Sequence, residues 1–157
     1  MTEDMTPSLL TQMKLKTISL DTKSSFQRIQ VVETEDFGKT LVLDGRTQSA
    51  AFDEWVYHET LVHPAMLQHP DPKVVFIGGG GELATAREVL RHRSVQRVVM
   101  CDIDKKVVDT SRELLPEWGK GCTEDPRLEL NYSDAHAFLR ESLDTFDLII
   151  MDIAGGF

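Results

Sequence analysis

The sequence predicts an α/β protein in which a small N-terminal antiparallel β unit precedes an incomplete Rossmann-like parallel sheet. Residues 73–104 have the pattern of a strand, a glycine turn, a helix and a second strand. Strand-like and helix-like stretches keep alternating after residue 104, which is typical of parallel sheets with right-handed crossovers. Earlier in the chain, Asp44 and Gly45 separate two strand-like runs. Asp-Gly in that setting indicates a hairpin, because both turn positions need a positive φ.

The composition narrows the range of functions. The chain has 157 residues, enough for one ordinary domain core, and a net charge of -9. This charge argues against nucleic acid as a partner, since phosphate binding needs a basic face. An acidic protein suits a cationic substrate, but the same charge is explained equally well by solubility, so both explanations stay open.

The two cysteines, Cys101 and Cys122, form no metal-binding or disulfide pattern, which fits a reducing compartment. The first residues are acidic and polar, and no apolar run is long enough for a signal core or a membrane span. We therefore expect a soluble cytoplasmic protein that does not bind a membrane.

The N-terminal part divides into three segments. Residues 1–13 are expected to form a flexible N-terminus. Residues 14–52 form the predicted β domain, with alternating strands at Lys14–Leu20 and Phe26–Glu33 and a hairpin at the Asp-Gly turn. Residues 53–72 are expected to be connecting helices that begin after Asp53. Pro64 should end or kink the first of them, because it lacks a backbone N–H and its ring clashes with the preceding turn.

Residues 73–157 are predicted to form a Rossmann-like nucleoside-binding domain. Asp104 is expected to cap its second helix. The chain ends soon after the fourth strand, where such a sheet normally continues, so we expect this domain to be incomplete. The predicted strands are residues 74–77, 98–101, 128–132 and 146–151, and the predicted helices are residues 83–92, 105–115 and 135–142.

A glycine-rich turn follows the first strand of this domain. Gly79, Gly81 and Ala84 fit the pattern G-x-G-x-x-A, and Asp102 follows 21 residues after Gly81, at the end of the next strand. Glycines allow close approach of the backbone to a ligand, and an acid at the next strand end can accept both ribose hydroxyls. With its strand, helix and distal acid in place, the motif predicts a nucleoside-containing ligand.

An acid follows each of the four predicted strands: Glu82, Asp102, Asp134 and Asp152. Ligands of open α/β sheets bind at this edge. Helix capping explains any one of these acids equally well. It explains the set less well, because Asp152 has no helical pattern behind it and Asp102 precedes the expected cap Asp104.

Glu82 lies within the glycine turn, where it would repel the pyrophosphate of a nicotinamide cofactor. A sulfonium nucleoside or an amine is a better fit to this position. An ordinary methyltransferase of this architecture usually carries an acid just before the first glycine, where this chain has Ile77. The turn therefore favours a cationic nucleoside and disfavours an ordinary methyltransferase.

The motifs resemble those of the polyamine synthases, or aminopropyltransferases. The resemblance spans roughly residues 14–152 and rests on LVLDGRTQSA, FDEWVYHETLVHPAMLQHPDPKVVFIGGG and VVMCDIDKKVVD. The stretch GGGELATAREVLRH, with Glu82, and the MCDID stretch, with Asp102, look closest to thermospermine synthases among the spermidine, spermine and thermospermine enzymes. The resemblance implies a Rossmann-like domain of the S-adenosylmethionine-methyltransferase type. It also implies a homo-oligomer in the full-length form.

The resemblance further implies transfer of an aminopropyl group from decarboxylated S-adenosylmethionine, a co-substrate, to a polyamine, with release of methylthioadenosine. The acceptor would be spermidine or putrescine, and no metal or other cofactor is expected. Asp152 matches the catalytic acid. The donor-binding positions are Gln48, Gly79, Gly81, Asp102, Asp134 and Ala135, and the polyamine-binding positions are Tyr57, His58 and Glu82.

Some of these residues have ordinary structural explanations. Gln48 also fits a solvated strand residue, and Tyr57 and His58 also fit a packed tyrosine and a surface histidine on a helix. The family pattern after the catalytic acid is D-x-x-D-P, and here Gly155 replaces the second Asp and the proline is absent. We therefore expect a C-terminally truncated enzyme, and keep a donor-binding protein without catalysis and a methyltransferase as alternatives.

Overall fold

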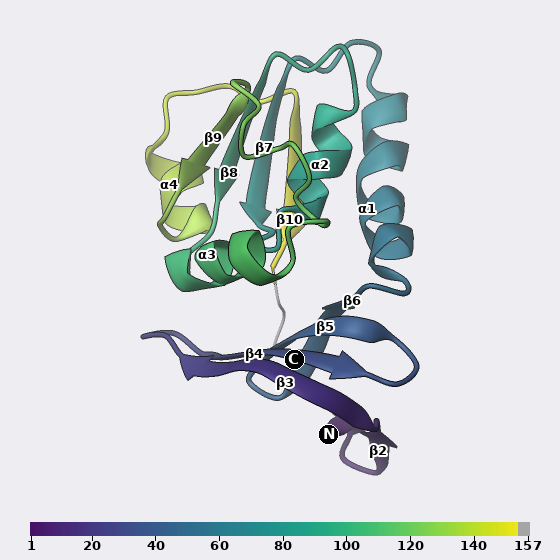
Figure 1. The fold of residues 1–157 in the computed structure, drawn as a ribbon. Coiled ribbons are helices and arrows are strands. Elements are labelled where there is room, and N and C mark those ends of the chain that lie inside the picture. Colours follow the sequence, from purple (N-terminus) through teal and green to yellow (C-terminus); the bar gives the residue numbers. More distant parts are fainter. Residues whose placement is uncertain (154–157) are drawn as a thin grey trace. The chain divides into compact units, whose positions relative to one another are not determined.

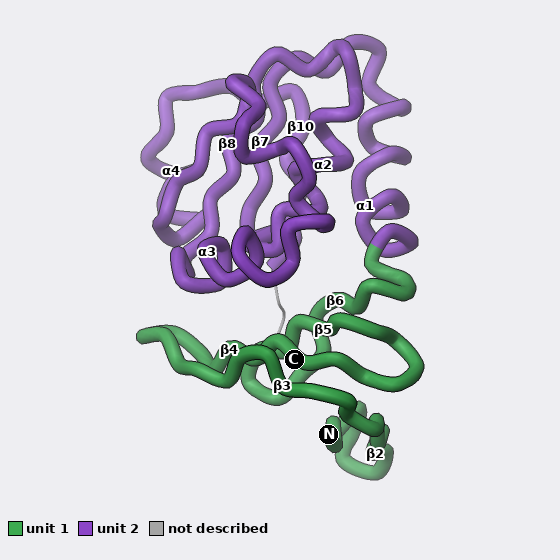
Figure 2. The backbone as a smooth tube through the Cα atoms, in the orientation of Figure 1, with its two compact units in different colours: residues 1–54 green, residues 55–157 purple. Residues whose placement is uncertain are grey.

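The structure is a computed structural model that describes residues 1–153 (Figure 1). It divides into two compact units, residues 1–54 and the residues from 55 onward, which Figure 2 distinguishes by colour. The first unit contains strands only, and the second contains a parallel sheet with helices.

The first unit is built on an antiparallel sheet with the strand order β3-β4-β5-β6. Asp44 and Gly45 have φ values of 49° and 80°, so the predicted Asp-Gly hairpin between β5 and β6 is confirmed. Residues on both faces of this sheet are buried, among them Val31 and Leu41 on one face and Val32 and Val42 on the other. The strands are β3 (Leu15–Lys23), β4 (Arg28–Thr34), β5 (Gly38–Leu43) and β6 (Arg46–Ala50).

Residues 1–13 differ from the flexible terminus that we expected. They form an antiparallel hairpin of β1 (Thr2–Thr6) and β2 (Leu9–Gln12). The backbone N–H of Thr47 donates to Glu3 Oε1 at 3.1 Å, which ties the hairpin to β6. The side chains of both strands are almost all exposed, so no apolar alternation marks these strands in the sequence.

The second unit contains a four-stranded sheet, all parallel, with the order β10-β7-β8-β9. This arrangement confirms the predicted α/β class. The chain moves outward from β7 to β9 and then returns to the other side of β7, so the topology reverses between β7 and β10. The strands are β7 (Val74–Gly79), β8 (Arg97–Cys101), β9 (Leu128–Asn131) and β10 (Leu148–Asp152).

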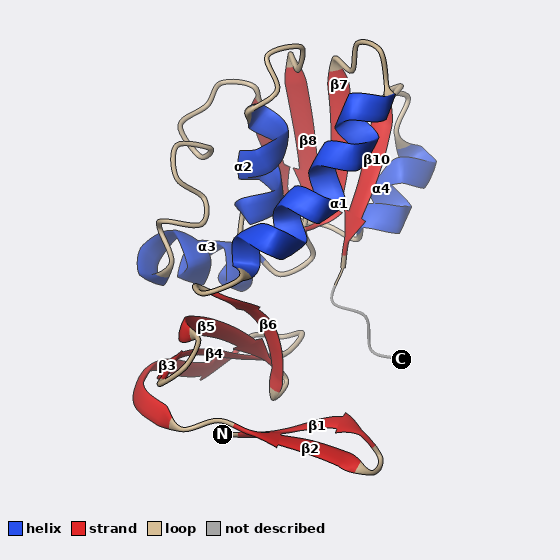
Figure 3. Ribbon diagram, turned by 90° about the vertical axis from the view of Figure 1, so that its right-hand side faces the viewer, coloured by secondary structure: helices blue, strands red, loops and turns tan. Residues whose placement is uncertain are grey.

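Helices cover both faces of this sheet, with α1 and α2 on one face and α4 on the other (Figure 3). The period of two along β7 explains both cores, because Val75 and Ile77 point to one face and Phe76 to the other. Phe76 stacks on Phe138 of α4, with the ring centroids 5.7 Å apart. The helices are α1 (Glu54–Gln68), α2 (Ala84–Leu90), α3 (Lys105–Leu114) and α4 (Ala135–Glu141).

We expected Pro64 to end or kink the first connecting helix, and the helix does not end there. A single helix, α1, continues from Glu54 through Pro64 to Gln68. An interior proline costs about 3 kcal/mol, and burial of Val62 and Met66 against the sheet offsets this cost. Within residues 1–153, no helix has the length and apolar content needed to cross a membrane.

Candidate active site

The reversal between β7 and β10 brings two of the predicted acids to neighbouring strand ends. Asp152 is the last residue of β10, and Glu82 follows the turn after β7. Asp152 pairs in register with Gly79, and its carbonyl oxygen accepts a hydrogen bond of 2.9 Å from the Gly80 N–H. Open α/β sheets bind ligands at such a reversal, outside the carboxyl ends of the strands.

The glycine turn is shaped by contacts within the protein. Gly79 has a φ of +80°, and a Cβ there would collide with the backbone carbonyl of Asp152. A Cβ on Gly81 would lie 2.8 Å from Asp102 Oδ2 and 2.9 Å from Val107 Cγ1. Glycine at these two positions therefore lets the turn pass close to Asp102, which follows β8, and to Asp152, which ends β10.

Two hydroxyl groups hold the Asp152 carboxylate. Tyr57 on α1 donates to Oδ1 at 3.0 Å, and Thr85 on α2 donates to Oδ2 at 2.6 Å. Burial raises the pKa of Asp152, and the negative charge of Glu82 raises it further. Burial and the same carboxylate raise the pKa of Tyr57 to about 12, so Tyr57 remains a hydrogen-bond donor at neutral pH.

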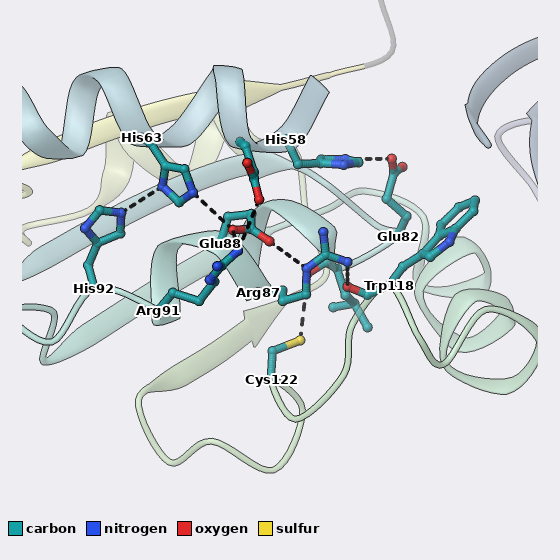
Figure 4. Close-up of polar contacts among 11 residues, drawn as sticks. His58, His63, Glu82, Arg87, Glu88, Arg91, His92, Trp118 and Cys122 are labelled. Carbon is teal, nitrogen blue, oxygen red and sulfur yellow. Dashed lines mark hydrogen bonds and ion pairs between the residues drawn. The ribbon is translucent and has the colours of Figure 1, made fainter. Parts of the chain in front are cut away.

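His58 reaches the site through Glu82 (Figure 4). Its ring is fully buried, and Nε2 lies 3.1 Å from Glu82 Oε1. The His58 and Tyr57 rings meet edge to face with centroids 5.1 Å apart. The family resemblance implies a polyamine contact for His58, whereas in the structure its ring is buried and contacts Glu82, whose side chain is 12% exposed.

Asp102 directly follows β8, next to the glycine turn. Its Oδ1 accepts a hydrogen bond of 2.8 Å from the Asp104 N–H. Burial raises the pKa of Asp102, and the backbone N–H groups of Asp104 and Gly81 work against this rise. Asp104 itself is the N-cap of α3, as the sequence predicted, and accepts from the Lys106 N–H at 3.1 Å.

Asp134 and Ala135 follow β9. Asp134 caps α4, and its Oδ1 accepts a hydrogen bond of 2.7 Å from the Ala137 N–H. Ala135 is buried, and its Cβ would lie 3.2 Å from a Cβ built on Gly78. The capping role that the sequence left open for Asp134 is therefore present in the structure, alongside its position at the carboxyl edge of the sheet.

Gln48 belongs to the first unit. It lies on β6, is partly buried, and its Nε2 donates to the Arg46 carbonyl at 3.2 Å. The other predicted site residues all belong to the second unit.

A second polar cluster joins α1 to α2 (Figure 4). Ligand atoms of Glu59, His63 and Glu88 lie within 4.8 Å of one another, as in a metal site. Arg91 contacts Glu88 Oε2 at 2.6 Å and Glu59 Oε1 at 3.3 Å, and Arg87 contacts Glu88 Oε1 at 2.8 Å. Two guanidinium groups thus already balance the two carboxylates, and we assign the cluster as an ion-pair network between the helices.

Thr85 is a site residue that the sequence did not suggest. It is fully buried in α2, and its partner Asp152 lies 67 residues further along the chain. A threonine near the start of a helix is an ordinary residue, so no local pattern identifies this contact.

Chemically, the converging carboxylates of Glu82, Asp102 and Asp152 form a site suited to a cationic ligand.

Family models match both units. Residues 54–155 match the model described as spermine/spermidine synthase domain, and residues 1–50 match the spermidine synthase tetramerisation domain. These are the kinds of protein that the motifs of the sequence resemble.

Similar proteins cover almost the whole chain. A polyamine aminopropyltransferase of Aeropyrum pernix is 48% identical over 152 residues, which cover 96% of this chain and 48% of that protein. Thermospermine synthase ACAULIS5 of Arabidopsis thaliana is 49% identical over 131 residues, covering 83% of this chain and 38% of that protein. The chain spans about half the length of the curated relatives it matches.

Solved structures share the fold. The spermidine synthase of Thermotoga maritima matches with a TM-score of 0.89 and 37% identity, over 92% of this chain and 50% of that one. A spermidine synthase in complex with the transition-state analogue AdoDATO matches with a TM-score of 0.90 and 37% identity, over 94% of this chain and 50% of that one.

Proposed function

The chain belongs to the spermine/spermidine synthase family, and from this premise we propose that it serves polyamine biosynthesis by aminopropyl transfer. The donor is decarboxylated S-adenosylmethionine, and the acceptor is an amine of putrescine or spermidine. The products are methylthioadenosine and a longer polyamine: spermidine, or thermospermine or spermine. The observation that carries this proposal is the convergence of Glu82 and Asp152 at the reversal between β7 and β10.

Five residues of the second unit are assigned to the donor. Asp102 accepts hydrogen bonds from the ribose hydroxyls, and Asp134 and Ala135 contact the adenine. Gly81 allows the backbone to approach the nucleoside, since it has no side chain beside Asp102. Gly79 and, in the first unit, Gln48 are the remaining positions proposed for the donor. A spermidine synthase of similar fold has been solved in complex with the transition-state analogue AdoDATO, which supports a donor site of this class.

The acceptor amine poses the chemical problem. An alkylammonium with a pKa near 10.4 has no lone pair, and freeing it at pH 7 costs about 5 kcal/mol. Asp152 orients the amine and takes its proton, directly or through water, as the carbon–nitrogen bond forms and the carbon–sulfur bond breaks. Its raised pKa improves the match to this role.

Glu82 and Tyr57 are assigned to the polyamine. Glu82 holds an ammonium group, and its contact with His58 fixes the direction of its carboxylate. Tyr57 contacts the polyamine beside Asp152, to whose Oδ1 it donates a hydrogen bond. No metal takes part in this scheme, because the sulfonium is already a good leaving group.

We also propose that the first unit forms a homo-oligomer. Its match to a tetramerisation domain supports this assignment. Leu9, Leu10, Ile18 and Phe26 of this unit are more than half exposed, which suits a surface covered by another subunit. The buried free thiols of Cys101 and Cys122 fit a reducing, cytoplasmic setting.

Calorimetry with methylthioadenosine and with spermidine tests the proposed function. We expect both to bind, and mass spectrometry of a mixture of the donor with spermidine should detect the longer polyamine. Failure of both ligands to bind would overturn the proposal.

A second candidate is a donor-binding protein without catalysis. The sequence has Gly155 where the family pattern has an acid, a position outside the described residues. Binding of methylthioadenosine without binding of spermidine, and without product, would favour this candidate over the transferase.

A further inference from the structure

Thr85 is the buried partner of the proposed catalytic acid. Its side chain has no exposed surface, and its hydroxyl donates to Asp152 Oδ2 over 2.6 Å. A valine would have the same branched shape and would fill the same space. Packing therefore does not require the hydroxyl group, and its evident use is the bond to Asp152.

The surroundings of Asp152 leave its carboxylate in one orientation. Tyr57 holds Oδ1 and Thr85 holds Oδ2, from two different helices. On the glycine side, a Cβ on Gly80 would lie 3.3 Å from Oδ2, so the turn closes around this oxygen. The backbone of Asp152 is also fixed, since its carbonyl accepts from the Gly80 N–H.

The surroundings of Asp152 shift its pKa in opposite directions. Burial and the negative charge of Glu82 disfavour its ionised form. Three groups favour the ionised form: the Thr85 hydroxyl, His58 and the Tyr57 hydroxyl, of which Thr85 has the largest effect. Thr85 is thus the main group that opposes burial and repulsion.

We propose that Thr85 is a positioning residue, which fixes the orientation of the Asp152 carboxylate and stabilises its ionised form. This role rests on the proposed transferase function. Asp152 must be ionised to receive the proton that the amine nitrogen loses. In the transfer, the nitrogen forms a bond to the aminopropyl carbon, sulfur keeps the electron pair of the broken bond, and the proton passes to Asp152.

The direct test is the pKa of Asp152, measured by ¹³C NMR of the side-chain carboxyl groups and assigned with Asp152→Asn. Thr85→Val should raise this pKa by about one pH unit, because it removes a hydrogen bond to the charged form. Thr85→Ser keeps a hydroxyl and should restore the original value. The matched control is Thr110→Val, another buried threonine in a helix, which should leave Asp152 unchanged.

The NMR measurement does not depend on turnover, so the two proposals can fail separately. Methylthioadenosine binding together with an unmoved pKa in Thr85→Val would reject the role of Thr85 and leave the transferase function standing. A shifted pKa of Asp152 in a chain that binds neither nucleoside nor spermidine would support the role of Thr85 and reject the transferase function. Circular dichroism melting shows whether each variant is folded. If Thr85→Val does not fold, the pKa of Asp152 in Thr85→Ser is the test, and a changed value there would reject the role of Thr85.

Discussion

The phenol of Tyr57 lies 3.0 Å from Asp152 Oδ1, although 95 residues separate the two in the chain. Tyr57 lies in the first turn of α1 and Asp152 at the end of β10, so the contact joins the start of the second unit to β10. It forms only if α1 and β10 both pack on the sheet as the structure has them.

The hydrogen bond from Tyr57 favours the ionised form of Asp152, but less than the bond from Thr85 does. We expect Tyr57→Phe to raise the pKa of Asp152 by less than Thr85→Val does, as measured by ¹³C NMR. Tyr132→Phe, a change in the only other tyrosine, serves as the control. A larger shift from Tyr57→Phe than from Thr85→Val would contradict this order.

Asp152→Asn should stabilise the protein and abolish transfer. The pKa of Asp152 is raised in the folded state, so its ionised form costs stability at neutral pH. Replacing it should raise the Tm at pH 7 by about 2–4 °C. The gain should shrink as the pH falls toward the ordinary pKa of 3.8, where the native carboxyl is itself protonated. Affinity for methylthioadenosine should not change, and a lower Tm at pH 7 would argue against a destabilising charge.

Asp102→Asn should weaken donor binding. A charged acceptor contributes roughly 2 kcal/mol more than a neutral one when it binds hydroxyl groups, so the Kd for methylthioadenosine should rise about 30-fold. Asp109→Asn removes an exposed acid of α3 that pairs with Lys105, and provides the control. Calorimetry of both variants gives the comparison, and equal affinities would exclude Asp102 from the ribose site.

Gly79→Ala should destabilise the second unit strongly. Its positive φ costs alanine about 1 kcal/mol, and the new Cβ would also meet the Asp152 carbonyl. We expect a total loss of about 3 kcal/mol or more. Gly121→Ala is matched for backbone conformation, since its φ is +78° and no atom lies within 4 Å of the added Cβ. Denaturant unfolding gives the free energy of unfolding of both variants. The loss in Gly121→Ala reports the backbone strain alone, and the additional loss in Gly79→Ala reports the collision with the Asp152 carbonyl.

Glu88→Gln should destabilise the α1–α2 network. Burial works to raise the pKa of Glu88, but hydrogen bonds from Arg87 and Arg91 outweigh it and lower the pKa. Leaving the arginines without this charge should lower the free energy of unfolding by about 3 kcal/mol. Glu59→Gln, at a more exposed position, should lower it by less.

The pH dependence of Glu88 follows from this direction. Folding lowers the pKa of Glu88, so its carboxylate contributes to the free energy of unfolding at pH values above the ordinary pKa of 4.5. This contribution is lost as the pH falls through the pKa of Glu88 in the folded protein. Unfolding experiments should therefore find the Glu88→Gln penalty at pH 7 and a smaller penalty below about pH 4. A penalty independent of pH would mean that packing, and not charge, accounts for the loss.

Much of the architecture could be predicted from the sequence, because local signals and burial agree there. The Asp44-Gly45 turn and the apolar run at residues 74–77 are examples. The sequence allowed Pro64 to end or kink its helix, and the helix does not end there. Packing of Val62 and Met66, which no short window of sequence contains, outweighs the local cost of the proline.

The site itself was only partly predictable. Position at a strand end predicted that Glu82 and Asp102 lie at the carboxyl edge of the sheet, since parallel strands bring their carboxyl ends together. Thr85 and the burial of His58 depend on contacts between helices and strands far apart in the sequence. Hydroxyl and ring positions of this kind leave no periodic trace in the chain.

The hydrogen bond from the Gly80 N–H to the Asp152 carbonyl has a practical consequence for protein engineering. Loop grafts or random mutations in residues 78–81 would displace the acid along with the turn, so libraries built there should be poor in functional clones. Diversity belongs instead at exposed positions of α1 such as Val56, where side chains can vary while the backbone around Asp152 stays in place.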